Sequence, residues 1–328
     1  MRVMLTGATG FLGGHLLDRL LSDSVEVAAV VRSQPAADAL VRRGVDAIVG
    51  SLEDPAAMRE SLREATDCVF HVAADTSTWR GHAERQTRTN VEGTRNVLAA
   101  AQAAGVRRFV HTSSVSAFGQ QDEALTERSP RLGKESWINY ERTKAIAEEL
   151  VLDADARGAI EVIVLNPAHI LGPGDTHNWA SMFLLIDQGR LPGAPPGSGA
   201  FADVREVARA EIAAWRHDRH GEQFLLGGVQ ASFLELIQTI ARELERKAPA
   251  KAMPAGFIRG YARLLDAISR VTGREPPLTP QAVSFTCHHL QVDSSKAVRE
   301  LGYRTTPLDV LVRDTCSWLR EHGMLKPR

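Results

Sequence analysis

The sequence predicts an α/β fold, in which a parallel, doubly wound sheet is followed by a smaller and mostly helical C-terminal lobe. Apolar strands and amphipathic helices alternate through the first half of the chain, as they do in repeated βαβ units. After residue 167 the alternation stops, and a stretch rich in glycine and proline at 172–200 leads into helices without regular strands between them. A ligand is expected beyond the carboxyl ends of the strands, under the lobe.

Each expected element carries a local signal. The run of β-branched residues at 25–31 is typical of a strand that is buried on both faces. Pro55 suits the first turn of a helix, and Gly105 suits the end of one. The expected strands are residues 3–5, 25–31, 46–49, 68–72, 108–112, 161–165 and 223–226. The expected helices are residues 15–21, 36–43, 54–65, 90–104, 138–157 and 204–215, with further helices over 229–290.

Three glycines, Gly7, Gly10 and Gly13, separate the first strand from the first helix with the spacing Gly-x-x-Gly-x-x-Gly. In a strand-to-helix turn this is a dinucleotide fingerprint of the Rossmann type. Gly7 permits the tight turn, Gly10 lets a pyrophosphate approach the backbone, and Gly13 lets the helix pack closely on the strand. The helix N-terminus then attracts the phosphates. The alternative is an ordinary glycine-rich turn.

The same turn contributes further expected cofactor contacts through Thr9, Phe11 and Leu12. We therefore assign residues 1–167 and 204–227 to a Rossmann dinucleotide-binding domain. Residues 168–203 and 228–328 form the expected substrate-binding lobe.

Composition excludes several other classes of protein. The 328 residues are 44% hydrophobic and 24% charged, which is ordinary for a globular enzyme. A net charge of −1 gives no reason to expect nucleic-acid binding or attraction to an anionic membrane, and no apolar run is long enough to cross one. Cys68, Cys287 and Cys316 lie far apart, which argues against disulfides or a zinc site and favours the cytoplasm. The adjacent His288 and His289 lack further ligands, so no metal is expected.

A candidate catalytic set lies near the middle of the chain. Tyr140 and Lys144 are four residues apart and share one face of a helix, and Ser114 follows the strand at 108–112. A free tyrosine has a pKa of about 10, so an acid that works near neutral pH needs a shift of roughly three units. An ammonium group about 4 Å away contributes a comparable amount. The alternative is a partly buried tyrosine with a solvated lysine.

With these motifs in place, the chain resembles the extended short-chain dehydrogenases/reductases, in their dihydroflavonol-reductase-like and hopanoid-associated epimerase-like branch. The matching segments are 6–13, 71–74, 90–96, 112–114, 140–144, 166–167, 172–175 and 203–205. The resemblance implies that Ser114 holds a carbonyl oxygen, in preference to Ser113 or Ser116. It also implies that Tyr140 is the general acid/base and that Lys144 binds the nicotinamide ribose.

Arg32 ends the second strand, where an NAD site usually has an acidic residue, and Glu26 lies at the wrong end of that strand. An arginine there can pair with a 2′-phosphate, so NADP(H) is favoured, while NAD(H) stays open if Arg32 is only a surface residue.

In the family that the chain resembles, an acidic residue is common at the position of Ser51, so the contact to the adenine is left open. Other expected cofactor contacts are Ser51, Leu52, Ala73, Ala74, Ser113, Pro167 and His169, with His169 as a pocket wall, while Asn90 is interpreted as a helix N-cap.

Five loop residues are expected to line the substrate pocket or, equally, to fill the core: Thr76, Trp79, Phe118, Trp179 and Phe183. The favoured function is NADPH-dependent reduction of a ketone or aldehyde. A nucleotide-sugar epimerase or dehydratase with tightly bound NAD is the alternative, although the Arg-Asp pair common in such enzymes is replaced by Gly199 and Ala200. A non-catalytic NADP-binding sensor is a third hypothesis. By analogy, the helices at 90–104 and 138–157 form a homodimer interface.

Overall fold

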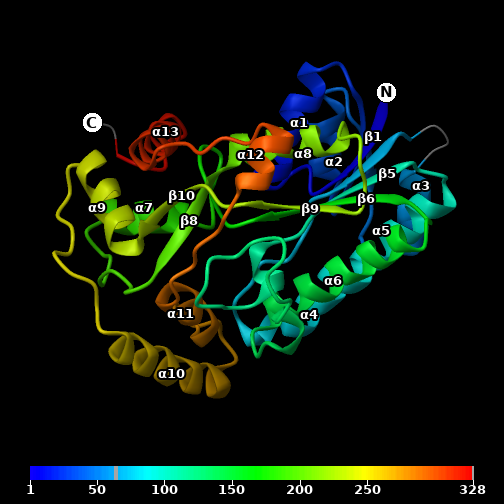
Figure 1. Cartoon of the computed structure of the whole chain (residues 1–328). Coiled ribbons are helices and arrows are strands. Elements are labelled where there is room, and N and C mark those ends of the chain that lie inside the picture. The colour runs from blue at the N-terminus through cyan, green and yellow to red at the C-terminus, as the bar shows by residue number, and fades with distance from the viewer. Residues whose placement is uncertain (63–65, 327–328) are drawn as a thin grey trace.

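The computed structural model describes residues 1–62 and 66–326. Its main sheet has seven strands in the order β3-β2-β1-β4-β5-β6-β9, and every neighbouring pair is parallel (Figure 1). The strand order reverses beside β1, which is where a doubly wound sheet binds its ligand. The strands are β1 (Arg2–Thr6), β2 (Glu26–Val31), β3 (Asp46–Val49), β4 (Cys68–His71), β5 (Arg108–Thr112), β6 (Glu161–Pro167) and β9 (Glu222–Leu226). The predicted α/β Rossmann fold is confirmed.

Helices cover both faces of this sheet, because alternate residues of each strand point to opposite sides. Val3 and Leu5 of β1 belong to the core under α1 (Phe11–Ser22), α2 (Gln34–Val41) and α8 (Val204–Trp215). Met4 belongs to the opposite core, under α3 (Pro55–Ser61), α5 (Gly93–Ala103) and α6 (Asn139–Ala156). Both faces of the strands are therefore apolar, as the run at 25–31 predicts.

The C-terminal lobe contains a small sheet that the sequence analysis missed, with the strand order β10-β8-β7. Its strands are β7 (His169–Leu171), β8 (Ser198–Asp203) and β10 (Val229–Ser232). The helices of the lobe are α7 (Ala180–Asp187), α9 (Phe233–Glu243), α10 (Ala255–Thr272), α11 (Pro280–Cys287), α12 (Ser295–Leu301) and α13 (Leu308–Glu321). Phe183, Phe201 and Phe233 lie at the centre of the lobe's own core.

Several expected boundaries differ from the observed ones. Helix α1 begins four residues before the predicted start, directly after Gly10. The helix expected at 90–104 is the end of a longer helical run, which comprises α4 (Ala83–Thr87), a π-helical turn (Arg88–Glu92) and α5. The interpretation of Asn90 as an N-cap is therefore wrong. Part of the helix expected at 54–65 falls outside the described residues. Short 3-10 helices span Arg80–His82, Val115–Phe118 and Gly133–Glu135.

Among the described residues, the structure has no helix that is both long enough and apolar enough to span a membrane. The two parts of the fold share apolar contacts: Ala297 of α12 and Tyr303 after it lie in the same core as β1 and α8. The division of the chain into 1–167 with 204–227 and 168–203 with 228–328 stays a prediction.

Candidate active site

The glycine-rich turn has the close contacts that its spacing predicts. Gly7 has a positive φ of 75°, and a Cβ atom on it would lie 2.9 Å from the amide nitrogen of Ala73. A Cβ atom on Gly13 would lie 2.0 Å from the carbonyl oxygen of Gly7. Helix α1 starts after Gly10 without a side-chain cap, so its first N–H groups remain available to an anion. This turn fits the diphosphate of a dinucleotide.

The other residues predicted around this turn have different surroundings. Thr9 is exposed, Phe11 is half-buried against His15, and Leu12 is buried in the core beneath α1. Leu12 can therefore offer a cofactor only its backbone.

The segment after β4 is held against the glycine-rich turn by Thr6, the last residue of β1. Its hydroxyl oxygen accepts hydrogen bonds from the backbone N–H groups of Val72 and Ala73, both at 3.1 Å. The same hydroxyl lies 2.9 Å from Nδ1 of His71, whose Nε2 lies 2.8 Å from the Thr94 hydroxyl. Burial lowers the pKa of His71 to about 3, so this histidine is neutral. It acts as a fixed polar link, and Ala73 is held beside Gly7.

Asn90 connects the loop after β4 to the helix that bears Tyr140. Its Oδ1 accepts a hydrogen bond from the Asp75 backbone N–H at 2.7 Å. Its Nδ2 donates to the Asp75 carbonyl at 3.0 Å and to the Thr143 hydroxyl at 3.1 Å. The side chain is buried, so these bonds fix the loop relative to α6. This role was not predicted from the sequence, because it depends on partners that lie 15 and 53 residues away along the chain.

The structure brings Ser114 and Tyr140 together. Ser114 directly follows Ser113 after β5, and its Oγ accepts a hydrogen bond from the Ser116 backbone N–H at 3.1 Å. Tyr140 lies in the first turn of α6, near the Ser114 side chain. Burial raises the pKa of Tyr140, and the nearby Ser114 side chain partly offsets that rise. The phenol is therefore protonated at neutral pH and can serve as an acid.

Lys144 lies one turn further along α6, where it is buried and donates from Nζ to the Thr112 carbonyl at 2.7 Å. Burial lowers its own pKa to about 7. The expectation that its ammonium group holds the pKa of Tyr140 down is wrong for this structure, because the pKa of Tyr140 is raised. The reason is that both side chains are desolvated and the lysine charge is itself destabilised.

A buried carboxyl group lies on the other side of β5. Glu211 of α8 is fully buried, and its Oε1 accepts a hydrogen bond from the Thr112 hydroxyl at 2.5 Å. Burial raises the pKa of Glu211 to about 7, and its negative charge in turn raises the pKa of Lys144. Thr112 thus joins the two groups, with its carbonyl to Lys144 and its hydroxyl to Glu211. The sequence signal was available, because Val207, Glu211 and Trp215 are four apart on one helical face.

The remaining cofactor candidates lie at strand ends. Arg32 directly follows β2 and is exposed, and no described side chain forms an ion pair with it. Ser51 follows β3, and its hydroxyl accepts from the Glu53 N–H at 3.1 Å. Leu52 packs against the core beneath α5, while Ala74 extends the segment after β4. The Ser113 backbone N–H donates to the Leu165 carbonyl at 2.7 Å, and Pro167 ends β6.

His169 belongs to an aromatic cluster instead of a proton-transfer chain. Its ring centroid lies 5.1 Å from that of Trp179, 5.6 Å from Phe201 and 5.9 Å from Phe233. Burial lowers its pKa to about 4, so the imidazole is neutral at physiological pH. These surroundings favour a wall of the site over a proton donor.

The expected substrate-pocket residues divide into two groups. Phe118 and Phe183 are fully buried in apolar cores, Phe118 beside Val115 and Phe183 beside Ile186. A side chain without exposed surface cannot contact a substrate, so the prediction of these two as pocket linings is wrong. Thr76 is exposed, and Trp79 and Trp179 are half-buried. The Trp79 indole donates to the Ser269 hydroxyl of α10 at 3.1 Å.

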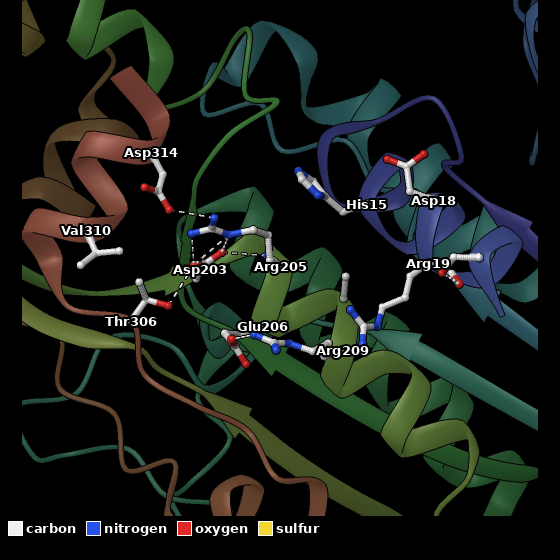
Figure 2. Close-up of a pocket in the computed structure, with 12 residues that line it drawn as sticks. His15, Asp18, Arg19, Asp203, Arg205, Glu206, Arg209, Thr306, Val310 and Asp314 are labelled. Carbon is white, nitrogen blue, oxygen red and sulfur yellow. Dashed lines mark hydrogen bonds and ion pairs between the residues drawn. The ribbon is translucent and has the colours of Figure 1, made fainter. Parts of the chain in front are cut away.

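A surface cavity of about 640 Å³ lies elsewhere, between α1, α8 and α13 (Figure 2). Its walls carry ion pairs, in which Arg205 bonds Asp203 at 2.7 Å and Asp314 at 2.8 Å. None of the predicted catalytic side chains is among the described residues that line it. Several of these charges are paired with one another, and Asp203 also caps α8 by accepting the Arg205 N–H at 2.9 Å. This network holds helices together. Among the described residues, no cluster of acidic, histidine or cysteine side chains is arranged to hold a metal ion.

A glycine-rich turn at the reversal point of a parallel sheet, followed along the chain by a serine after β5 and a tyrosine and a lysine on α6, is typical of an enzyme class that works with a nicotinamide dinucleotide. The family model described as "NAD dependent epimerase/dehydratase family" matches residues 3–227, and the chain belongs to this family, whose members include the extended short-chain dehydrogenases/reductases.

Several relatives, including the following three, match almost the whole chain. It is 32% identical over 330 residues to sterol demethylase protein B of Methylococcus capsulatus, which covers 99% of this chain and 100% of that protein. It is 30% identical over 330 residues to the "Putative dihydroflavonol 4-reductase" of Synechocystis, covering 98% and 95%. It is 33% identical over 313 residues to the 4-hydroxy-2-methyl-3-oxo-4-farnesyl-3,4-dihydroquinoline-1-oxide ketoreductase of Stigmatella aurantiaca, covering 92% of each. The predicted family and reductase-like branch are confirmed.

Proposed function

We propose that this protein is an NADPH-dependent reductase of a ketone or aldehyde, acting in the cytoplasm, with Tyr140 as the proton donor. The observation that carries most weight is that the Tyr140 phenol lies near the Ser114 side chain, with Lys144 one helical turn away. A protonated phenol beside a second hydroxyl can donate to a carbonyl oxygen as that oxygen gains charge. The names of two relatives, a dihydroflavonol 4-reductase and a ketoreductase, support the same reaction type.

The residues divide the work between binding and proton transfer. Gly7, Gly10 and Gly13, with the first N–H groups of α1, would hold the diphosphate of the dinucleotide. The bound nicotinamide would supply the hydride. Ser114 would donate a hydrogen bond to the substrate oxygen, and Tyr140 would pass its phenol proton to that oxygen as the alcohol forms.

Lys144 would have two tasks. One is the contact to the nicotinamide ribose that the family resemblance implies. The other is to restore the proton that the phenol gives up, because a lysine with a pKa of about 7 is partly protonated at neutral pH. The buried Glu211 carboxyl group behind Thr112 would keep that pKa from falling further.

Arg32 supports NADPH over NADH. It is an exposed guanidinium at the end of β2, where an acidic residue would repel a 2′-phosphate. A guanidinium can instead pair with the phosphate in a forked geometry. The 2′-phosphate of NADPH would then lie beside Arg32.

Cofactor titration tests this assignment. The stripped protein is titrated with NADPH and with NADH, and the released material is assayed for NAD. We expect NADPH to bind more tightly and no NAD to be retained. Arg32→Ala should weaken NADPH binding by about tenfold or more and leave NADH binding unchanged, since a charged hydrogen bond contributes about 1.5–3 kcal/mol.

Arg42→Ala is the matched control, because Arg42 is also exposed and lies at the end of α2. It should change neither affinity. Preference for NADH, or NAD that stays bound through purification, would instead favour a nucleotide-sugar epimerase. Tight NADPH binding without turnover of any carbonyl compound would favour a sensor.

A further inference from the structure

Helix α10 carries an apolar stripe that the protein leaves uncovered. Phe257, Tyr261, Leu264, Ile268 and Val271 are between 49% and 89% exposed. Their spacings alternate between four and three residues, so all five lie on one side of the helix. They are five of the eleven large apolar side chains that are exposed in the described part of the chain. Isolated apolar residues on a surface are common, but a continuous stripe of them marks a surface that binds something.

The opposite side of α10 fixes its orientation. Ile258 and Ala262 pack into a small core with Val283 and Cys287 of α11. Ser269 accepts the hydrogen bond from Trp79, and Asp266 forms an ion pair with Arg80 at 2.8 Å. These contacts hold one face of the helix, so rotation cannot bury the stripe. Figure 1 shows α10 at the lower edge of the molecule, next to α11 and away from the main sheet.

The charges of α10 differ from those of the chain as a whole. The helix contains Arg259, Arg263 and Arg270, all exposed, and its one acidic residue is Asp266. Asp266 is buried between Arg80 and Arg270, which neutralise it. The three arginines fall on one flank of the helix, between the stripe and the packed face. The surface around α10 is therefore positively charged, although the net charge of the whole chain is −1.

An apolar stripe beside a basic flank fits a lipid surface with anionic headgroups. Such a helix lies in the plane of the interface, with its apolar side chains among the acyl chains and its cations at the phosphates. A second copy of this chain fits less well. A helix of 18 residues is about 27 Å long, and one pair of such helices buries less than the 1,200–2,000 Å² typical of a stable interface.

We propose that α10 docks the protein on an anionic membrane surface, with the stripe from Phe257 to Val271 inserted and the arginine flank at the headgroups. Because Trp79 and Arg80 are bonded to α10, docking brings the loop after β4 to the membrane as well. The docking is independent of the chemistry at Tyr140. A protein without turnover could still bind lipid, and a reductase could fail to bind it.

Vesicle flotation of the whole protein tests the proposal. Vesicles of phosphatidylcholine are compared with equimolar phosphatidylcholine and phosphatidylglycerol. We expect the protein to float with the anionic vesicles, and its binding to weaken as salt rises. Leu264→Ser with Ile268→Ser should lower the partition coefficient by about tenfold or more, since it removes two inserted side chains. Arg263→Glu should weaken binding most at low salt.

Val41→Ser is the matched control, because Val41 is an exposed apolar residue of α2 on the main sheet. It should bind vesicles like the unmodified protein. Thermal unfolding and NADPH titration establish that each variant is folded. Absence of flotation with anionic vesicles, or equal partitioning of the double variant, would overturn the proposal. So would a dimer in solution that the double variant dissociates, since the stripe would then belong to a second copy.

Discussion

The Tyr140 phenol is the group whose loss has the clearest consequence. It lies near the Ser114 side chain, and burial keeps it protonated. We predict that Tyr140→Phe lowers kcat for carbonyl reduction by about 10²–10⁴-fold, the usual contribution of a general acid. NADPH affinity should change little, because the ring remains and the glycine-rich turn is untouched. Steady-state kinetics together with NADPH fluorescence titration measure both.

Tyr261→Phe is the control for this substitution, since Tyr261 is exposed on α10, outside the proposed site. The Tyr261→Phe protein should keep full turnover with a soluble substrate, because Tyr261 lies outside the candidate active site. If a folded Tyr140→Phe protein also kept its turnover, Tyr140 would not be the acid.

Gly13 gives a second prediction for a single residue. A Cβ atom there would lie 2.0 Å from the Gly7 carbonyl oxygen, so α1 must move away from β1 to admit it. We predict that Gly13→Ala weakens NADPH binding and lowers the free energy of unfolding by about 1–3 kcal/mol. Gly14→Ala is a matched control one residue along the same helix.

A Cβ atom on Gly14 meets nothing within 4 Å, so its replacement should stabilise the helix by about 0.5–1 kcal/mol and leave cofactor binding intact. Urea unfolding and NADPH titration distinguish the two variants. Equal behaviour of both would mean that the turn does not depend on close packing.

At the scale of elements, β5 separates two buried ionisable groups that Thr112 connects. The pKa of Glu211 rises from 4.5 to about 7, so between these values the folded protein binds a proton that the unfolded chain does not. Stability must therefore fall as pH rises through this window. The pKa of Lys144 falls from 10.5 to about 7, so above neutrality the unfolded chain binds the extra proton and stability rises again. Taken alone, the titration of Glu211 and Lys144 predicts a minimum in folding stability near neutral pH.

We predict that Glu211→Gln removes the falling part of this profile. Gln keeps an acceptor for the Thr112 hydroxyl but does not ionise, so stability near pH 7 should rise relative to pH 5 by on the order of 1–3 kcal/mol. Urea unfolding across the pH range measures the effect. A variant with the same falling limb as the unmodified protein would show that another group titrates there. The variant also loses the charge that supports the Lys144 ammonium, so its pH–rate profile should move to lower pH.

What the sequence predicts at this scale follows from how local each signal is. The long strands and the set of Ser114, Tyr140 and Lys144 are encoded in short motifs, and the structure has the strands and the predicted elements around that set. The strands β7 and β10 are short, and Gly199 and Ala200 give β8 no β-branched signal. They form because β8 pairs with β10 across about thirty residues of chain, which no local pattern records.

The site follows the same rule. Asn90 and Asp75 meet at a separation of 15 residues, and Thr112 and Glu211 meet at 99. Their roles depend on partners that only the folded chain brings close. Phe118 and Phe183 were wrongly predicted to line the pocket. An aromatic residue in a loop has the same sequence signal whether it fills a core or lines a pocket.

At the scale of the whole molecule, the homodimer interface predicted for the helices at 90–104 and 138–157 can be tested on α5. Ala99 and Ala103 are exposed and four residues apart, so they permit close approach of another helix. We predict a dimer by light scattering at micromolar concentration, and a monomer for Ala103→Glu. Ala39→Glu on α2 is the control, because Ala39 is also exposed and α2 covers the opposite face of the main sheet. A monomeric unmodified protein would reject this interface.

The packing of Ala297 and Tyr303 against the first core has a consequence for synthesis on the ribosome. The nucleotide-binding sheet begins at β1, but its last strand is β9, and its core is closed by residues that leave the ribosome near the end of translation. The strands that are synthesised first therefore expose apolar surface until the end of translation. Exposed apolar surface of this kind is what chaperones bind. A chain that stops before Tyr303 would not yield a smaller working half, but an open core that is prone to aggregation.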